Sequence, residues 1–452
     1  MTGQDIQALA AQIDTLIAVR PVGRVTRVRS GIIEVSGLGA DVRIGDRIDI
    51  RRSGAGPLRS EVVQLQDDAV IVLPEAEATG TALQDRAVAI GESVIAPADG
   101  WIGRIIDPDG VPLDGKPLLR GMTARPLRAA PPVPAVRRGL GDRLDTGLAV
   151  TNTFLPIVRG QRIGLFAGSG VGKSSMLGTL ATRMQADVVV AALIGERGRE
   201  VRHFVDTVIG PEGLARSVVV AATSDQSALQ RRRCAWTAMT VAEYFRDQGK
   251  SVLVLADSVT RFAEAHREVA IAAGEAPVLR GYPPSTAALI MGLCERAGPG
   301  AKDQGDITAL FSVLVPGSDM EEPIADILRG VLDGHIVLDR AIAERGRFPA
   351  IDVLKSVSRS LPAAASASEN AMLQEARKLL GLYERNAVMI RAGLYTHGTD
   401  PELDQAVAVW SDLDAFIGQP AVHDCAHSFQ QLSLILRRAR STGKSGQFTT
   451  QT

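Results

Sequence analysis

Short apolar runs alternate with longer amphipathic segments through the middle of the chain. Strands are predicted at the apolar runs, at residues 163–166, 188–194, 217–222 and 251–256. Helices are predicted between them, at residues 176–184, about 200–208 and 228–248. This alternation is typical of a mainly parallel sheet with helices on both faces, so the central part of the chain is predicted to be an α/β domain.

The pattern differs before and after this region. Between Val22 and Ala96, short β-rich runs are separated by Gly, Asp and Pro, which predicts a small closed or sandwiched β domain without a catalytic cluster. After Arg359 the apolar spacing becomes helical. Ser366 and Glu369 have the spacing of a capping box at the start of the first helix, which Gly393 can end. Two more helices are predicted, one starting at Asp400-Pro401 and one at 422–439.

The two ends of the chain are predicted to lie outside these domains. An apolar stripe from Asp5 to Ile17 predicts a helix, which could pack on its own chain or dock a partner. Residues 441–452 are small and polar, which predicts disorder. The predicted boundaries are 1–20 for the helix, 21–96 for the β domain, 97–362 for the α/β domain, 363–440 for the helical domain and 441–452 for the tail.

Composition narrows the classes of protein to which the chain can belong. Of 452 residues 45% are apolar and 22% charged, which is typical of a globular protein with ample core. A net charge of −1 and 4% aromatic residues argue against a nucleic-acid partner. The apolar runs are too short to span a membrane, and no signal-peptide pattern is present. The widely spaced cysteines are expected to be buried in a reducing compartment, so the cytoplasm is predicted. They are Cys234, Cys294 and Cys425.

Residues 166–175 carry the most specific motif of the chain, which predicts a phosphate-binding (Walker A) loop; the alternative is an ordinary Gly-rich turn between a strand and a helix. It lies where a predicted strand gives way to a predicted helix, the context that such a loop requires. Small residues let backbone N–H groups converge on phosphate oxygens at the positive end of a helix. Lys173 can reach the β- and γ-phosphates, and Ser174 can ligate Mg²⁺. Ala167 stands where the motif has its first Gly. The predicted nucleotide-binding residues of the loop are Gly168, Ser169, Gly170, Val171, Gly172, Lys173, Ser174 and Ser175.

Two carboxylates follow predicted strands and are candidates for the chemistry. Asp257 ends an apolar strand and would hold Mg²⁺ through a coordinated water; the alternative is an Asp that caps a strand–helix turn. Glu196 follows the strand at 188–194, and ligands of open parallel sheets bind at the carboxyl ends of strands. It could therefore polarise an attacking water near Lys173, or form a surface salt bridge. Within the helix at 228–248, Arg231-Arg232-Arg233 is predicted to be a solvated face or a subunit contact.

These motifs resemble those of the catalytic subunits of rotary ATPases, and more narrowly the type III secretion ATPases. The resemblance runs from about Gly23 to Gln419 and is greatest to the flagellum-specific export ATPases. The segments that carry it are the phosphate loop, Gly195–Glu200, Asp257–Phe262, Arg280–Ser285, Glu322–Asp326, Asp333–Leu338, Arg347–Asp352 and Leu354–Arg359. The fold that it implies is a RecA-like P-loop NTPase core preceded by a β-barrel and followed by a helical C-terminal domain.

The resemblance also implies a role for individual residues. Glu196 matches the catalytic glutamate and Asp257 the Mg²⁺-linked aspartate. Arg359 matches an arginine finger that enters the neighbouring subunit's site, where such a residue is worth roughly 10³ to 10⁵ in rate. Phe348 matches the aromatic residue against which adenine packs, with core packing as the alternative. The residues that match positions near the phosphates are Arg197 and Arg261.

The function that the resemblance implies is Mg²⁺-dependent ATP hydrolysis that powers export of unfolded flagellar proteins. The expected form is a homo-hexameric ring in the cytoplasm, associated with a membrane-embedded export apparatus. The expected partners are a peripheral-stalk-like regulator at the N-terminal helix, a central stalk protein, export-gate components, and export substrates with their chaperones. Four alternatives stay open: an injectisome ATPase, a rotary ATP synthase-type subunit, a ring-shaped nucleic-acid motor, and a non-catalytic nucleotide-binding subunit.

Overall fold

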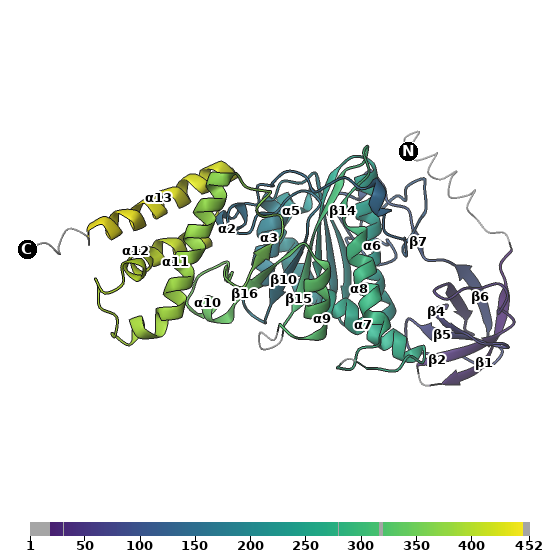
Figure 1. The fold of residues 1–452 in the computed structure, drawn as a ribbon. Coiled ribbons are helices and arrows are strands. Elements are labelled where there is room, and N and C mark those ends of the chain that lie inside the picture. Colours follow the sequence, from purple (N-terminus) through teal and green to yellow (C-terminus); the bar gives the residue numbers. More distant parts are fainter. Residues whose placement is uncertain (1–18, 30, 279, 316–319, 446–452) are drawn as a thin grey trace, which may run out of the picture.

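The computed structural model describes residues 19–29, 31–278, 280–315 and 320–445. A β-barrel, an α/β layer and a group of helices follow one another along an elongated molecule (Figure 1). The barrel and the helices therefore lie at opposite ends, with the α/β layer between them. The helix predicted from Asp5 to Ile17 lies outside the described residues.

The N-terminal barrel confirms the small closed β domain that the sequence predicts. Its antiparallel strands are joined in the order β1-β2-β5-β4-β3-β6, so no edge is left open to pair with another chain. Side chains alternate between core and surface: in β2, Ile33 and Val35 are fully buried. The strands are β1 (Val22–Arg29), β2 (Ile32–Ser36), β3 (Arg47–Arg51), β4 (Leu58–Leu65), β5 (Val70–Pro74) and β6 (Arg86–Gly91).

The central sheet confirms the predicted parallel α/β core. Its strand order is β17-β16-β10-β15-β13-β11-β12-β8, and β14 pairs with β15. All neighbouring pairs are parallel except those that involve β14 and β17. The strands are β8 (Arg104–Ile106), β10 (Arg162–Ala167), β11 (Val188–Glu196), β12 (Ser217–Thr223), β13 (Ser251–Asp257), β14 (Gly298–Pro299), β15 (Asp306–Leu314), β16 (Gly334–Leu338) and β17 (Val357–Ser358). The short pair β7 (Val94–Ile95) and β9 (Arg125–Pro126) forms a separate ribbon.

Helices cover both faces of this sheet, and its central strands are accordingly mostly apolar. In β11, Val189 and Leu193 pack on the side of α3, whereas Val188 and Val190 pack on the side of α6, α7 and α8. The helices are α2 (Ala149–Asn152), α3 (Lys173–Arg183), α4 (Gly198–His203), α5 (Gly210–Leu214), α6 (Ala228–Asp247), α7 (Val259–Ala272), α8 (Ser285–Arg296), α9 (Pro323–Val331) and α10 (Arg340–Glu344). The helix predicted at about 200–208 is instead α4 followed by a π-helical turn, Phe204–Ile209.

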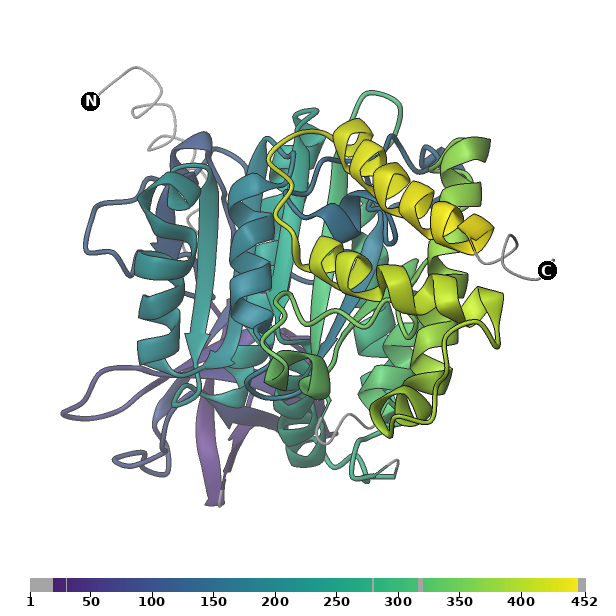
Figure 2. The ribbon, with the colours of Figure 1, turned by 90° about the vertical axis from the view of Figure 1, so that its left-hand side faces the viewer.

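Three helices form the C-terminal end of the described chain and pack in front of the α/β layer (Figure 2). They are α11 (Ala367–Arg391), α12 (Pro401–Gly418) and α13 (Cys425–Ser445). The predicted capping box is present, because the Ser366 hydroxyl accepts from the Glu369 N–H and the Glu369 carboxylate accepts from the Ser366 N–H. Helix α13 continues past the predicted boundary at residue 440. Among the helices of the described residues, none has the length and apolarity needed to cross a membrane.

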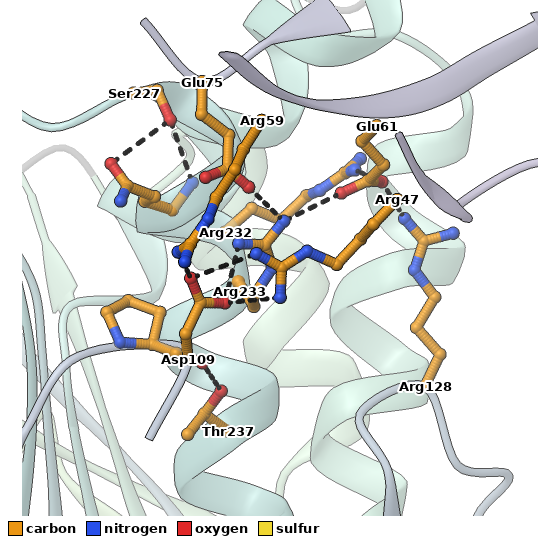
Figure 3. A network of polar contacts seen from close by, with 12 residues as sticks. Arg47, Arg59, Glu61, Glu75, Asp109, Arg128, Ser227, Arg232, Arg233 and Thr237 are labelled. Carbon is orange, nitrogen blue, oxygen red and sulfur yellow. Dashed lines mark hydrogen bonds and ion pairs between the residues drawn. The ribbon is translucent and has the colours of Figure 1, made fainter. Parts of the chain in front are cut away.

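A buried network of charges joins the barrel to α6 (Figure 3). Arg233 forms ion pairs with Glu75 at 2.7 Å and Glu61 at 3.5 Å on the barrel, and with Asp109 at 3.0 Å on the turn after β8. Its neighbour Arg232 pairs with Glu61 at 2.7 Å. Burial by itself would lower the pKa of Arg233, but the three carboxylates outweigh burial and raise the pKa.

The prediction of a solvated face or subunit contact at residues 231–233 is therefore wrong for two of the three arginines. Arg232 and Arg233 are 5% and 2% exposed, and their partners lie on the barrel and on the turn after β8 of the same chain. These pairs could not be predicted from the sequence pattern, because the partners lie more than a hundred residues earlier in the chain. Charged pairs this deep in the protein fix the orientation of the two parts that they join.

Removing Arg233 should destabilise the whole chain, because Glu75 and Asp109 would keep their charges in a buried place without their main partner. We expect Arg233→Ala to lower the free energy of unfolding by about 3–5 kcal/mol. Urea unfolding of the full chain, followed by far-UV circular dichroism, measures this loss.

The matched control is Arg202→Ala, which removes an exposed pair with Asp206 on one helical surface. This substitution should lower the free energy of unfolding by less than about 0.5 kcal/mol. If the two variants lost equal amounts of unfolding free energy, the buried network would have no structural role.

Candidate active site

The carboxyl ends of three parallel strands meet at one edge of the sheet. β15 lies between β10 and β13, and β11 lies beside β13, with Leu193 opposite Asp257 in the register. The turns after β10, β11 and β13 therefore open on the same side. These are the turns that carry Lys173, Glu196 and Asp257.

The phosphate loop has the backbone that its glycines predict. The turn joins the end of β10 to Lys173, the first residue of α3. Gly170 and Gly172 have φ angles of 76° and 87°, in the left-handed region that favours glycine. Ala167 is still part of β10 and is buried, so the motif's first position does not need glycine here. Ser174 and Ser175 follow in the first turn of α3.

Lys173 lies at the centre of the site. Its ammonium group forms an ion pair with Asp257 and lies 3.9 Å from a carboxylate oxygen of Glu196. The three side chains are mostly buried, with exposed fractions of 13%, 7% and 20%. The three residues that the sequence predicts from three separate motifs are therefore brought together.

The carboxyl group of Glu196 has an unusual affinity for protons. Burial raises its pKa to about 7; a hydrogen bond with Glu200 and the charge of Asp257 act in the same direction, while Lys173 opposes them. The corresponding hydrogen bond lowers the pKa of Glu200. A carboxylate whose pKa lies near the working pH is well matched to accept a proton from a water molecule.

Arg197 and Arg261 flank the site from the two neighbouring turns. Arg197 pairs with Glu200 at 3.0 Å, and Arg261 pairs with Glu264 at 2.9 Å. The aliphatic part of Arg261 lies against Gly195, where an added Cβ would be 3.4 Å away. Each guanidinium is thus near the edge of the site but held by a carboxylate of its own turn or helix.

An aromatic side chain lies beside Gly172, at the end of the phosphate loop. The ring of Phe348 would lie 3.0 Å from a Cβ added to Gly172, and 51% of Phe348 is exposed. Core packing, the alternative for this residue, does not fit that exposure. Beside it lies an open cleft of about 650 Å³ between the loop at 346–348 and the helices α12 and α13.

Arg347 holds this loop in place and was not predicted to contribute to the site. Its guanidinium donates to the carbonyl groups of Pro349 and Ile351, each at 2.9 Å, and pairs with Asp414 of α12 at 3.1 Å. The other residues of the cleft that the sequence did not indicate include Gln419, Gln431, Leu434 and Ile435. They lie far along the chain from the phosphate loop, and no motif links the two regions.

Arg359 is the predicted site residue that does not join the others. It directly follows β17, is exposed, and donates to the carbonyl of Arg329 on α9 at 3.1 Å. In the part of the chain that the structure describes, it forms no ion pair with an acidic side chain. Its guanidinium is accordingly accessible from outside the subunit.

The chain is similar to known ATPases over most of its length. Residues 147–358 match the ATP synthase alpha/beta family, nucleotide-binding domain, and residues 365–433 match the T3SS EscN ATPase C-terminal domain. The Flagellum-specific ATP synthase of Caulobacter vibrioides is 45% identical over 92% of this chain and 95% of its own. That of Salmonella typhimurium is 42% identical over 94% of this chain and 96% of its own. The chain belongs to the flagellar and type III secretion ATPases.

A solved structure of the same family has the same fold. The assembled ATPase EscN of an enteropathogenic E. coli type III secretion system superposes with a TM-score of 0.86 at 38% identity. The match covers 92% of this chain and all of the EscN chain. A barrel, a P-loop core and C-terminal helices are thus the architecture of the family, and this chain is an ATPase.

The residues of this ATPase fit a metal ion that is held mainly by its substrate. No cluster of three or more His, Cys, Asp or Glu side chains suited to a metal occurs in the described residues. Mg²⁺ commonly binds through one or two protein ligands plus substrate phosphates and water. The Ser174 hydroxyl in the first turn of α3 and the buried Asp257 carboxylate suit that mode, and such an ion would neutralise charge on the phosphates.

The raised pKa of Glu196 predicts how turnover depends on pH. Only the ionised carboxylate can accept a proton, so the rate should rise with pH through about 7 and level off above it. Steady-state ATP hydrolysis between pH 5.5 and 9, at saturating ATP and Mg²⁺, measures this profile.

Glu196→Gln is the matched variant, since it keeps the size of the side chain and removes the ionisation. Its residual turnover should be at least about 100-fold lower and should lose the rise near pH 7. A variant that keeps full turnover would show that Glu196 is not the base.

Proposed function

We propose that this chain hydrolyses Mg²⁺-ATP and couples hydrolysis to the export of unfolded flagellar proteins through a type III secretion apparatus. The observation that carries the proposal is the meeting of Lys173, Glu196 and Asp257 at one edge of the sheet. Relatives that are 40% to 45% identical over most of the chain are named flagellum-specific, which supports the flagellar assignment.

The places of the residues around the loop support a role for each of them. Backbone N–H groups of residues 168–175 cradle the phosphates, and Lys173 neutralises charge on the β- and γ-phosphates. Ser174 and Asp257 hold Mg²⁺, with Asp257 acting through a coordinated water. Glu196 orients the attacking water and takes its proton. Arg197 and Arg261 add positive charge at the rim.

Phe348 supplies a flat apolar surface for the adenine ring. Its exposed ring lies next to Gly172, at the end of the phosphate loop, and faces the cleft bounded by α12 and α13. A base stacked there places the triphosphate on the loop. The anchoring of Arg347 to Asp414 keeps Phe348 in position.

Arg359 acts as an arginine finger in the site of a neighbouring subunit. Its exposed place away from Lys173 and Glu196 supports this role, because a site that needs its charge must obtain it from another copy. Such a head-to-tail contact closes into a ring, here a homo-hexamer. The related EscN is described as assembled, and in a second structure as a complex with its central stalk EscO.

The proposed ring works in the cytoplasm beside the membrane-embedded export apparatus. A central stalk protein occupies its opening, and a regulator of the peripheral-stalk type binds the N-terminal segment. Export-gate components and chaperone-bound unfolded substrates complete the set of partners. ATP binding draws neighbouring subunits together and hydrolysis releases them, which moves loops at the central opening.

Export by an injectisome is the second candidate function. The Type 3 secretion system ATPase of Xanthomonas euvesicatoria is 39% identical over 91% of this chain, so the similarity to that branch also extends over most of the chain. Deletion of the gene distinguishes the flagellar function from the injectisome function. Loss of flagellar filaments with other secretion intact supports the flagellar assignment, and the reverse result contradicts it.

If a neighbouring subunit supplies Arg359 to the site, ATP turnover should depend on assembly of the ring. The turnover per subunit should rise with protein concentration, because the site is complete only between subunits. Arg359→Ala should lower the assembled rate by about 10³-fold or more while ATP binding changes little. Hydrolysis measured over a range of protein concentrations, with light scattering to follow assembly, tests both expectations.

Arg340→Ala is a suitable control, since Arg340 is another exposed arginine and pairs with Glu344 within α10. It should leave the concentration dependence and the rate unchanged. A rate per subunit that is constant upon dilution to monomers would rule out a shared site.

A further inference from the structure

Ser312 is a buried hydroxyl residue that none of the motifs includes. It lies on β15, between the strand that leads to the phosphate loop and the strand that ends in Asp257. Its exposed fraction is 0%, and its neighbours Phe311 and Val313 are buried apolar residues. A hydroxyl in such a place is costly unless it forms a hydrogen bond.

The hydrogen bond that Ser312 makes reaches the centre of the active site. Its Oγ donates to Oδ1 of Asp257 at 2.6 Å, a length typical of a hydroxyl donating to a charged acceptor. The ammonium group of Lys173 also pairs with Oδ1. Within the described part of the chain, both contacts of the Asp257 carboxylate fall on this one oxygen, so Oδ2 is left to accept from another donor.

The backbone around Ser312 leaves it little freedom. Its strand is hydrogen bonded to β10 on one side, with Leu165 opposite Ser312, and to β13 on the other. Two residues further on, the N–H of Leu314 donates to the hydroxyl of Thr260 at 2.9 Å, which ties the end of β15 to the first turn of α7. The donor therefore has a fixed position relative to Asp257.

We propose that Ser312 is a positioning residue for the metal-binding carboxylate. Its hydroxyl holds Oδ1 of Asp257, so that Oδ2 is presented to a water molecule bound to Mg²⁺. The role matters most when Lys173 turns to the phosphates, because Ser312 is then the contact that keeps the carboxylate in one orientation. This inference rests on the proposed Mg²⁺ site at Ser174 and Asp257.

Metal affinity tests the inference without relying on turnover. Binding of Mn²⁺ to the protein–ADP complex is followed by electron paramagnetic resonance of free Mn²⁺. Ser312→Ala should raise the Mn²⁺ dissociation constant by about tenfold, because loss of a partner that orients a metal ligand typically costs 10–100-fold. ADP affinity in EDTA should change less than about twofold, since the phosphate loop itself is untouched.

Two further substitutions at the same position separate orientation from packing. Ser312→Thr keeps the hydroxyl and should restore Mn²⁺ affinity to within about twofold of the original protein. Ser312→Cys keeps the approximate size but is a weak donor, so it should behave like Ser312→Ala. Unchanged Mn²⁺ affinity in Ser312→Ala, or an equal loss of ADP affinity in EDTA, would overturn the inference.

Two controls show which assignment fails if one does. Ser217→Ala removes another buried serine hydroxyl from the same sheet, at the start of β12, where it donates to the carbonyl of Gly213 at 2.6 Å. It should leave Mn²⁺ affinity unchanged. Asp257→Asn should weaken Mn²⁺ binding more than Ser312→Ala does. If Asp257→Asn has no effect, the proposed metal site is wrong; if it has an effect and Ser312→Ala has none, only the positioning role is wrong.

Discussion

The ion pair between Lys173 and Asp257 brings two separate motifs of the sequence together in the candidate active site. It joins the turn after β10 to the end of β13, although these strands are not neighbours in the sheet. β15 lies between them and contributes Ser312 to the same carboxylate. The strand between the two turns therefore fixes both the distance and the orientation of the side chains that they carry.

The chain also holds its domains together with buried charge. Arg233 connects α6 to carboxylates of the barrel and of the turn after β8, and Arg232 adds a second contact to Glu61. Because these pairs are removed from water, they are strong only in one geometry. The barrel thus keeps a defined orientation on the ATPase core.

The sequence predicts the parts of the site that lie within single motifs. The strand–glycine–helix pattern around Lys173 and the apolar strand before Asp257 depend on local rules, and both are found as predicted. Ser312, Arg347 and the pairs of Arg233 were not predicted, because each acts on residues far away in the chain and only the fold brings them together. Arg359 is exposed in the single subunit, and the role proposed for it concerns a second copy of the chain.

Complementation between two inactive variants tests the shared site most directly. Lys173→Ala and Arg359→Ala subunits are mixed in equal amounts before assembly, and ATP turnover is measured. Random assembly gives about a quarter of the interfaces both an intact Lys173 and a neighbour's Arg359, so a comparable fraction of activity should return. A mixture as inactive as either variant alone, with assembly confirmed, would contradict a site built from two copies of the chain.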